Sequence, residues 1–159
     1  MPIDITPSNR LPGGTLLDRA WIESHIPHKG SMCLLDEVLG WDAARIVCRS
    51  GSHRRADNPL RAHGRLGAAC GVEYAAQAMA VHGAIIASCA QTIARGGLLT
   101  SVRNLLLQVS RLDDLEADLI ASAERLAGDE GSALYGFTVS SGAREVLSGR
   151  ASIVFISGS

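Results

Sequence analysis

The sequence predicts an α+β fold in which an antiparallel sheet wraps around one long helix. Two β-like runs come first, and a segment of 24 residues, 67–90, follows them with a single formal charge. Four more β-like runs then fill the rest of the chain. Strands that are segregated from a single helix favour an antiparallel sheet over alternating β-α-β units. The helix is rich in alanine and glycine, so we expect a sheet to approach it closely and curl around it.

The composition is that of one globular domain. The chain has 159 residues, 47% of them hydrophobic, and a formal net charge of −1. This length supports a single core. We expect one domain over residues 15–159, preceded by a flexible N-terminal lead-in, residues 1–14, that is rich in Pro, Gly, Ser and Asn. A net charge near zero and few aromatic residues argue against binding to nucleic acid.

The cysteines and the beginning of the chain indicate the compartment. Cys33, Cys48, Cys70 and Cys89 are widely spaced and form no Cys-X-X-Cys pair. This pattern is typical of thiols in a reducing compartment rather than of a zinc site or a disulfide framework. The first residues lack the basic region and the apolar stretch of a signal peptide. We therefore expect a cytoplasmic protein that uses no metal and no cofactor.

The elements before the long helix are short. Apolar residues at helical spacing predict an amphipathic helix over 15–24, and Pro27 should end it by Ile26. The runs 32–41 and 45–50 are β-like, and the three residues between them predict a hairpin. The polar and basic stretch that follows predicts a loop.

The long helix is predicted over 67–90, and its only charged residue is Glu73. At about 1.5 Å per residue, a helix of this length matches the thickness of a bilayer. Gln77, His82 and the scarcity of large aliphatic residues nevertheless favour a helix inside a soluble fold, so we expect no membrane span. We expect Glu73 to be buried, which would raise its pKa toward neutrality and make it a general acid near neutral pH.

The second half of the chain predicts four strands. Turn-forming Asp, Gly and Ser residues separate them. In the third of these strands, Tyr135 and Phe137 alternate with Gly136 and Thr138, which is the period of two that a strand requires. The four predicted ranges are 98–109, 115–126, 133–140 and 145–156.

Three segments together resemble bacterial 3-hydroxyacyl-acyl-carrier-protein dehydratases. Residues 26–38, IPHKGSMCLLDEV, resemble the first-strand motif of that family. The loop 58–64, NPLRAHG, and the helical stretch 73–78, EYAAQA, resemble its catalytic-loop and central-helix signature. His63 and Glu73 are ten residues apart, which is shorter than in the common fatty-acid enzymes. This spacing is most similar to the short-loop dehydratases of aryl polyene and polyketide-type clusters.

The resemblance implies a hotdog fold, in which an antiparallel sheet wraps around one central helix. It implies a homodimer whose sheets join edge to edge, with active sites at the interface between the subunits. Dehydration of a 3-hydroxyacyl thioester to the trans-2-enoyl thioester is the implied reaction. The substrate would be carried on an acyl carrier protein or on coenzyme A.

The site residues follow from the resemblance and from helix chemistry. The resemblance implies that His63 of one subunit removes the C2 proton, and that Glu73 of the other subunit protonates the leaving hydroxyl. Backbone N–H groups at a helix start lack partners, so those of Ala68 and Ala69 are candidates for binding the thioester oxygen. Gln77 lies one turn after Glu73 and is expected to hold it or a backbone carbonyl in place.

Other interpretations stay open at this point. The same fold supports an acyl thioesterase, and the chain could be a non-catalytic partner subunit of a heterodimeric dehydratase. His63 alone could be an ordinary surface residue, and His28 is expected to make structural hydrogen bonds beside Pro27. The arginines of the loop could be solvated, or they could steer an acidic carrier protein toward the site.

Overall fold

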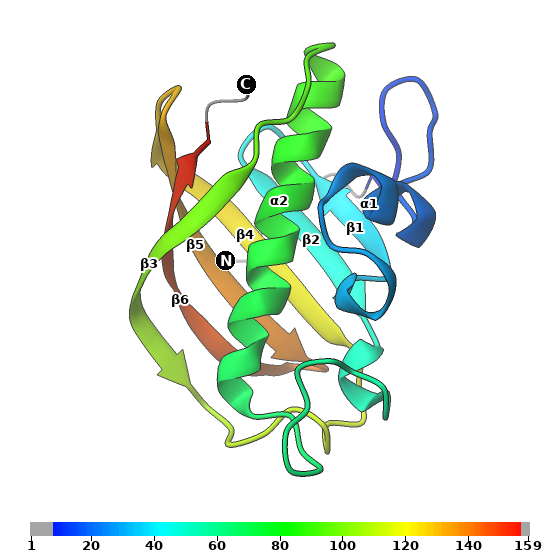
Figure 1. Ribbon diagram of the computed structural model, residues 1–159, viewed down its shortest axis with the longest axis vertical. Coiled ribbons are helices and arrows are strands. Elements are labelled where there is room, and N and C mark those ends of the chain that lie inside the picture. The colour runs from blue at the N-terminus through cyan, green and yellow to red at the C-terminus, as the bar shows by residue number, and fades with distance from the viewer. Residues whose placement is uncertain (1–7, 157–159) are drawn as a thin grey trace.

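The computed structural model describes residues 8–156 and shows a six-stranded antiparallel sheet wrapped around one long helix (Figure 1). The strand order is β1-β2-β4-β5-β6-β3, so β1 and β3 form the two edges. This is the predicted fold class. The elements of the sheet are β1 (Glu37–Trp41), β2 (Arg45–Ser50), β3 (Gly97–Leu107), β4 (Leu119–Gly128), β5 (Ser132–Ser141) and β6 (Arg144–Phe155).

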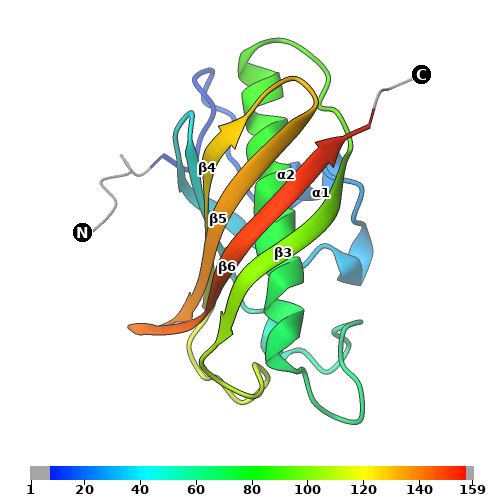
Figure 2. The ribbon, with the colours of Figure 1, turned by 90° about the vertical axis from the view of Figure 1, so that its left-hand side faces the viewer.

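The central helix α2 (Gly71–Cys89) packs one side against the concave face of the sheet, as the strands that cross it in Figure 2 show. Tyr74, Ala78, Val81 and Ile85 are fully buried on that side. Their spacing of three and four residues is that of one helix face. Within the described residues, no helix is long and apolar enough to cross a membrane.

Helix α2 begins later than the predicted start at residue 67, and a turn of 3-10 helix precedes it. The turn before it is a short 3-10 helix (Ala68–Cys70), and the α-helix itself begins at Gly71. A Cβ atom at this position would lie 2.2 Å from the Cδ2 atom of Leu147, whose side chain is fully buried. The glycine therefore lets the first turn of the helix approach β6 closely.

Helix α1 (Arg19–His25) lies beside α2 and agrees with the prediction for its C-terminal end. The Asp18 carboxylate accepts a hydrogen bond from the Trp21 N–H and caps the first turn. The helix stops at Ile26, directly before Pro27. Of the expected lead-in, residues 1–7 lie outside the described part of the chain.

Two predicted strands start later than expected. Residues 32–36 are not part of β1, because the Gln77 side chain bonds the backbone of Met32 and Leu34. Likewise β4 begins only at Leu119, because side chains bond the backbone carbonyls that precede it. His53 bonds the carbonyl of Leu115, and two other side chains bond the carbonyls of the next two residues. In both places, side chains that are distant in the sequence bond the backbone groups that a neighbouring strand would otherwise bond.

Strand β3 is a long and apolar sheet edge. It pairs with β6 alone, and its other edge faces outward. Five leucines of this strand are between 37% and 58% exposed. An exposed edge of this kind offers unpaired backbone groups and apolar side chains to a further strand. The leucines are Leu98, Leu99, Leu105, Leu106 and Leu107.

Candidate active site

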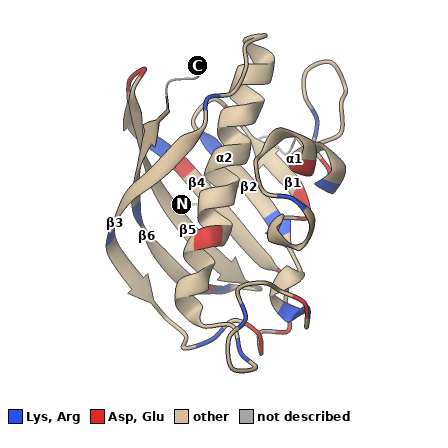
Figure 3. Cartoon of the chain, viewed as in Figure 1, with Lys and Arg blue, Asp and Glu red and all other residues tan. Residues whose placement is uncertain are grey.

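Glu73 is the single charged residue of α2, visible as the one red segment on that helix in Figure 3. Its side chain is 34% exposed, so the predicted burial is not found in the single chain. The reason is that the sheet covers only one side of the helix. Glu73, Ala76, Ala80 and Gly83 form a stripe on the side that the sheet leaves partly uncovered.

One oxygen of the Glu73 carboxylate contacts two side chains. Its Oε1 atom lies 3.2 Å from Nε2 of His28 and accepts a hydrogen bond of 3.2 Å from Nε2 of Gln77. Among the described residues, no side chain or backbone group bonds the Oε2 atom. The carboxylate is therefore anchored through one oxygen and presents the other.

Gln77 is fully buried behind Glu73 and connects the helix to the segment before β1. Its Nε2 donates to the carbonyl of Met32 at 2.8 Å, and its Oε1 accepts from the Leu34 N–H at 2.9 Å. The sequence analysis expected Gln77 to hold Glu73 or a backbone carbonyl, and in the structure its Nε2 atom contacts both. Because the amide is buried and bonded to protein groups, it positions Glu73 rather than facing a substrate.

His28 contacts Glu73, although the sequence analysis expected it only to make structural hydrogen bonds beside Pro27. Its neighbour Gly30 is held by α1, because Glu23 Oε1 accepts a 3.0 Å hydrogen bond from the Gly30 N–H and Arg19 donates to its carbonyl at 2.9 Å. The His28 side chain is 29% exposed, while its Nδ1 atom is buried and finds no partner among the described residues. The signal for His28 was present in the Pro-His motif, but the motif did not reveal its contact with Glu73.

His63 lies at the exposed tip of a tight turn. Ala62 and Arg65 exchange backbone hydrogen bonds of 2.9 and 3.1 Å across it. His63 and Gly64 both have positive φ, 54° and 73°, as in a two-residue type I′ turn. The sequence analysis paired His63 with Glu73 of a second subunit, and this pairing stays a prediction.

The two alanines before α2 differ in their backbone bonding. The Ala68 N–H donates to the carbonyl of Ser110 at 3.1 Å, so the expectation that it lacks a partner is wrong. The strand-like bridge between Gly67 and Arg111 brings this carbonyl close. Ala69 is exposed, and no acceptor for its N–H is found within residues 8–156. Ala69 thus remains a candidate for binding a thioester oxygen.

A buried polar cluster supports the helix beside Glu73. The hydroxyl of Tyr74 lies 2.8 Å from the Ser52 hydroxyl and accepts a 3.0 Å hydrogen bond from the Asn58 amide. Burial raises the pKa of Tyr74, so its phenol stays neutral. The cluster ties the loop before α2 to the helix.

The basic loop is largely neutralised. Arg54 pairs with Asp118 at 2.6 Å, and Arg55 pairs with Asp57 at 3.0 Å. Arg65 makes no ion pair within the described chain. The field that this loop presents to an approaching acidic protein is therefore weaker than its arginine count indicates.

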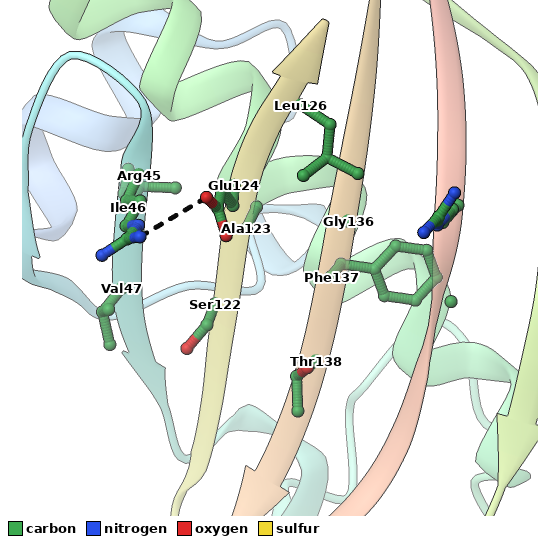
Figure 4. Close-up of a pocket in the computed structure, with 12 residues that line it drawn as sticks. Arg45, Ile46, Val47, Ser122, Ala123, Glu124, Leu126, Gly136, Phe137 and Thr138 are labelled. Carbon is green, nitrogen blue, oxygen red and sulfur yellow. Dashed lines mark hydrogen bonds and ion pairs between the residues drawn. The ribbon is translucent and has the colours of Figure 1, made fainter. Parts of the chain in front are cut away.

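A separate hollow of about 290 Å³ lies on the sheet face that points away from α2 (Figure 4). Gly136 leaves space there between the side chains of neighbouring strands, and Arg45 reaches Glu124 at 3.5 Å across the sheet. Because the sheet separates this hollow from Glu73, it does not belong to the candidate site.

An antiparallel sheet wrapped around one long helix is the hotdog fold, and solved structures that resemble this chain include a dehydratase complex and thioesterases. The chain matches the ApeP-like family, described as ApeP dehydratase, over residues 20–156. The chain therefore belongs to the ApeP-like dehydratase family, which confirms the predicted fold and the predicted class of reaction. None of the curated protein sequences compared with the chain matches it.

Solved structures agree with this assignment at the level of the fold. The dehydratase heterocomplex ApeI:P from Xenorhabdus doucetiae superimposes with a TM-score of 0.77 at 20% identity, covering 86% of this chain and 91% of that chain. A mutant thioesterase from Pseudomonas aeruginosa gives a TM-score of 0.57 at 12% identity, covering 87% and 94%. A hypothetical thioesterase with coenzyme A from Streptococcus pneumoniae gives 0.51 at 11% identity, covering 76% and 84%.

Proposed function

We propose that the protein removes water from a 3-hydroxyacyl chain that is carried as a thioester on an acyl carrier protein or on coenzyme A, in the cytoplasm. The product is the trans-2-enoyl thioester. The observation that carries the proposal is the lone carboxylate of α2, anchored through Oε1 and open at Oε2. A carboxyl group in this arrangement transfers protons from a fixed position.

The chemistry requires three contributions. One group removes the C2 proton, one group protonates the leaving C3 hydroxyl, and a donor stabilises the negative charge that develops on the thioester oxygen. Glu73 supplies the proton to the hydroxyl, and the Ala69 N–H at the start of α2 is placed to donate to the oxygen. For proton removal at C2, the resemblance points to His63 of a second subunit.

The exposed edge of β3 supports a dimer. A second copy that pairs along this edge would extend the sheet across both subunits and cover the exposed leucines. Lysine at both Leu98 and Leu106 would place charge on this edge. We expect this double variant to sediment as a monomer, whereas the wild type sediments as a dimer. A wild-type monomer would contradict the proposal for the partner.

The function is tested with Glu73→Gln on a 3-hydroxyacyl carrier protein, measuring enoyl formation by absorbance and free thiol in parallel. We expect the variant to lose at least about 100-fold in kcat, the lower end for loss of a general acid, and to keep its fold. Thiol release in place of enoyl formation would identify a thioesterase. Full activity of the variant would refute the role of Glu73.

A second candidate is a non-catalytic subunit that completes the site of a homologue. The solved ApeI:P structure is a heterocomplex of dehydratases, and the β3 edge would accept a homologous strand as readily as its own. The purified chain would then be inactive alone and would gain dehydration when mixed with the homologue. We expect activity from the chain alone.

A further inference from the structure

We propose that Asp113 is a positioning residue of the candidate active site, because its carboxylate holds the base of the turn that carries His63. The inference rests on the proposed dehydration and adds a residue to that site. Asp113 lies in the loop between β3 and β4, where the sequence indicated only a turn. Its side chain is nevertheless only 8% exposed.

Both ends of the turn meet this carboxylate. On the side after His63, Oδ1 of Asp113 accepts a 2.9 Å hydrogen bond from the Leu66 N–H. On the side before it, Nη1 of Arg61 lies 4.0 Å from Oδ2, and Nε of Arg61 donates to the carbonyl of Arg55 at 2.8 Å. One carboxylate therefore connects the two segments between which the turn projects.

The chain needs a side-chain acceptor at this place. Leu112 donates its N–H to the Leu66 carbonyl at 2.8 Å, but its own carbonyl accepts from the Leu115 N–H in the turn that follows. Leu66 is fully buried, so water cannot serve its N–H. A buried donor requires an acceptor, and among the described residues Asp113 is the acceptor found for this N–H.

Arg111 fixes the direction of the carboxylate. Its Nε donates to Oδ1 of Asp113 at 2.9 Å, and its Nη2 contacts Oδ2, so the pair is bidentate. Arg111 and the Leu66 N–H together hold the pKa of Asp113 well below its usual range. The carboxylate therefore stays charged throughout the pH range in which a histidine titrates.

The backbone beside Asp113 also supports the start of α2. The Ser110 carbonyl accepts from the Ala68 N–H at 3.1 Å, and Gly67 and Arg111 form an antiparallel bridge. Residues 66–68 are therefore bonded to the segment of Asp113 at each position.

This bonded stretch lies between two candidate groups of the site. His63 comes three residues before Leu66, and Ala69 directly follows the stretch. A displacement of about 1 Å at a reacting group can cost about 100-fold in rate, even when the substitution is far from the chemistry. Asp113 is almost fully buried and acts through the backbone, so its loss should lower kcat rather than weaken substrate binding.

The test compares Asp113→Ala, Asp113→Asn and Asp114→Ala in the full-length protein with a 3-hydroxyacyl carrier protein as substrate. We expect Asp113→Ala to lower kcat about 100-fold with KM within about threefold. Asn keeps an oxygen that accepts from the Leu66 N–H, so it should recover at least about tenfold of that loss. Asp114 is the neighbouring carboxylate and is 62% exposed, so its variant should stay within about threefold of the wild type.

Turnover is expressed per folded protein, with circular dichroism at the assay temperature as the measure of folding. If Asp113 served stability alone, the folded protein of every variant would turn over at the wild-type rate, and that result would overturn the inference. A folded Asp113→Asn variant as slow as Asp113→Ala, or an equal loss in Asp114→Ala, would overturn it as well. Failure of the proposed function is distinct, because the wild type would then form no enoyl product.

NMR judges the contact without any activity and without the alanine variant. In the wild type, the Leu66 amide should exchange its hydrogen as slowly as the Leu112 amide, whereas the exposed Gly64 amide exchanges fast. The side-chain resonances of His63 should shift in Asp113→Asn and stay in place in Asp114→Ala. A Leu66 amide that exchanges as fast as Gly64, or His63 resonances that ignore the substitution at Asp113, would overturn the inference even if the enzyme were inactive.

Discussion

Replacing Gln77 with leucine should destabilise the fold far more than a change of one polar side chain usually does. Leucine fills a similar volume but makes no hydrogen bonds. The substitution removes the donor to the Met32 carbonyl and the acceptor of the Leu34 N–H. Leu34 is fully buried, so water cannot replace the lost acceptor, whereas Met32 is half-buried and its carbonyl is partly compensated.

The magnitude follows from these two backbone groups. A buried polar group left without a partner costs about 1–3 kcal/mol, with the Leu34 N–H near the top of that range and the Met32 carbonyl near the bottom. We expect the free energy of unfolding to fall by about 4 kcal/mol. In a chain of this size, about 1 kcal/mol lowers the melting temperature by about 2–4 °C, so the expected loss is about 8–16 °C.

Urea denaturation and thermal melting at one fixed protein concentration measure this loss, because association would otherwise shift the apparent stability. Gln108→Leu is the matched control, since Gln108 is exposed and the same chemical change there should move the free energy of unfolding by less than about 0.5 kcal/mol. A loss of less than about 1 kcal/mol in Gln77→Leu would refute the reasoning that the amide joins the helix to the segment before β1.

Two further predictions concern packing and pH. Gly71→Ala should lower the free energy of unfolding by about 1–3 kcal/mol, because the added Cβ would meet the buried Leu147 side chain. Gly83→Ala is the control: its Cβ has open space around it, so the free energy of unfolding should rise by up to about 1 kcal/mol. Equal urea midpoints for the two variants would contradict the contact with Leu147. Burial lowers the pKa of His82, which contacts the Tyr135 hydroxyl. The unfolded chain therefore binds the proton more readily than the folded chain. The free energy of unfolding should fall as the pH drops below about 6.5, by at most about 1.4 kcal/mol per pH unit. Urea titrations at several pH values should show a smaller slope in His82→Gln, and an unchanged slope would refute the assignment.

The sequence predicted the architecture because most elements carry local signals. Alternation around Tyr135 and Phe137 located β5, and Pro27 marked the end of α1. The late starts of β1 and β4 escaped prediction for a physical reason. Their backbone groups are taken by Gln77 and His53, which are far away in the sequence, and no local pattern reports such partners.

The candidate site was predictable only in part. A lone charge in an apolar helix pointed to Glu73, but composition cannot tell which side of the helix the sheet leaves uncovered. The contact between residues 28 and 73 joins two elements that lie 45 positions apart, so His28 was recognisable as part of a motif but not as a neighbour of Glu73. The partner of the Ala68 N–H was hidden in the same way.

The three hydrogen bonds of Gln77 have a consequence for comparing related sequences. A lineage that abandons catalysis keeps the need for a stable fold, so selection would retain Gln77 after the reaction is lost. His28 makes no comparable backbone bond and would be free to drift. A glutamine at this helix position therefore marks the architecture, and an inactive descendant is to be recognised by a replacement at Glu73 while the glutamine persists.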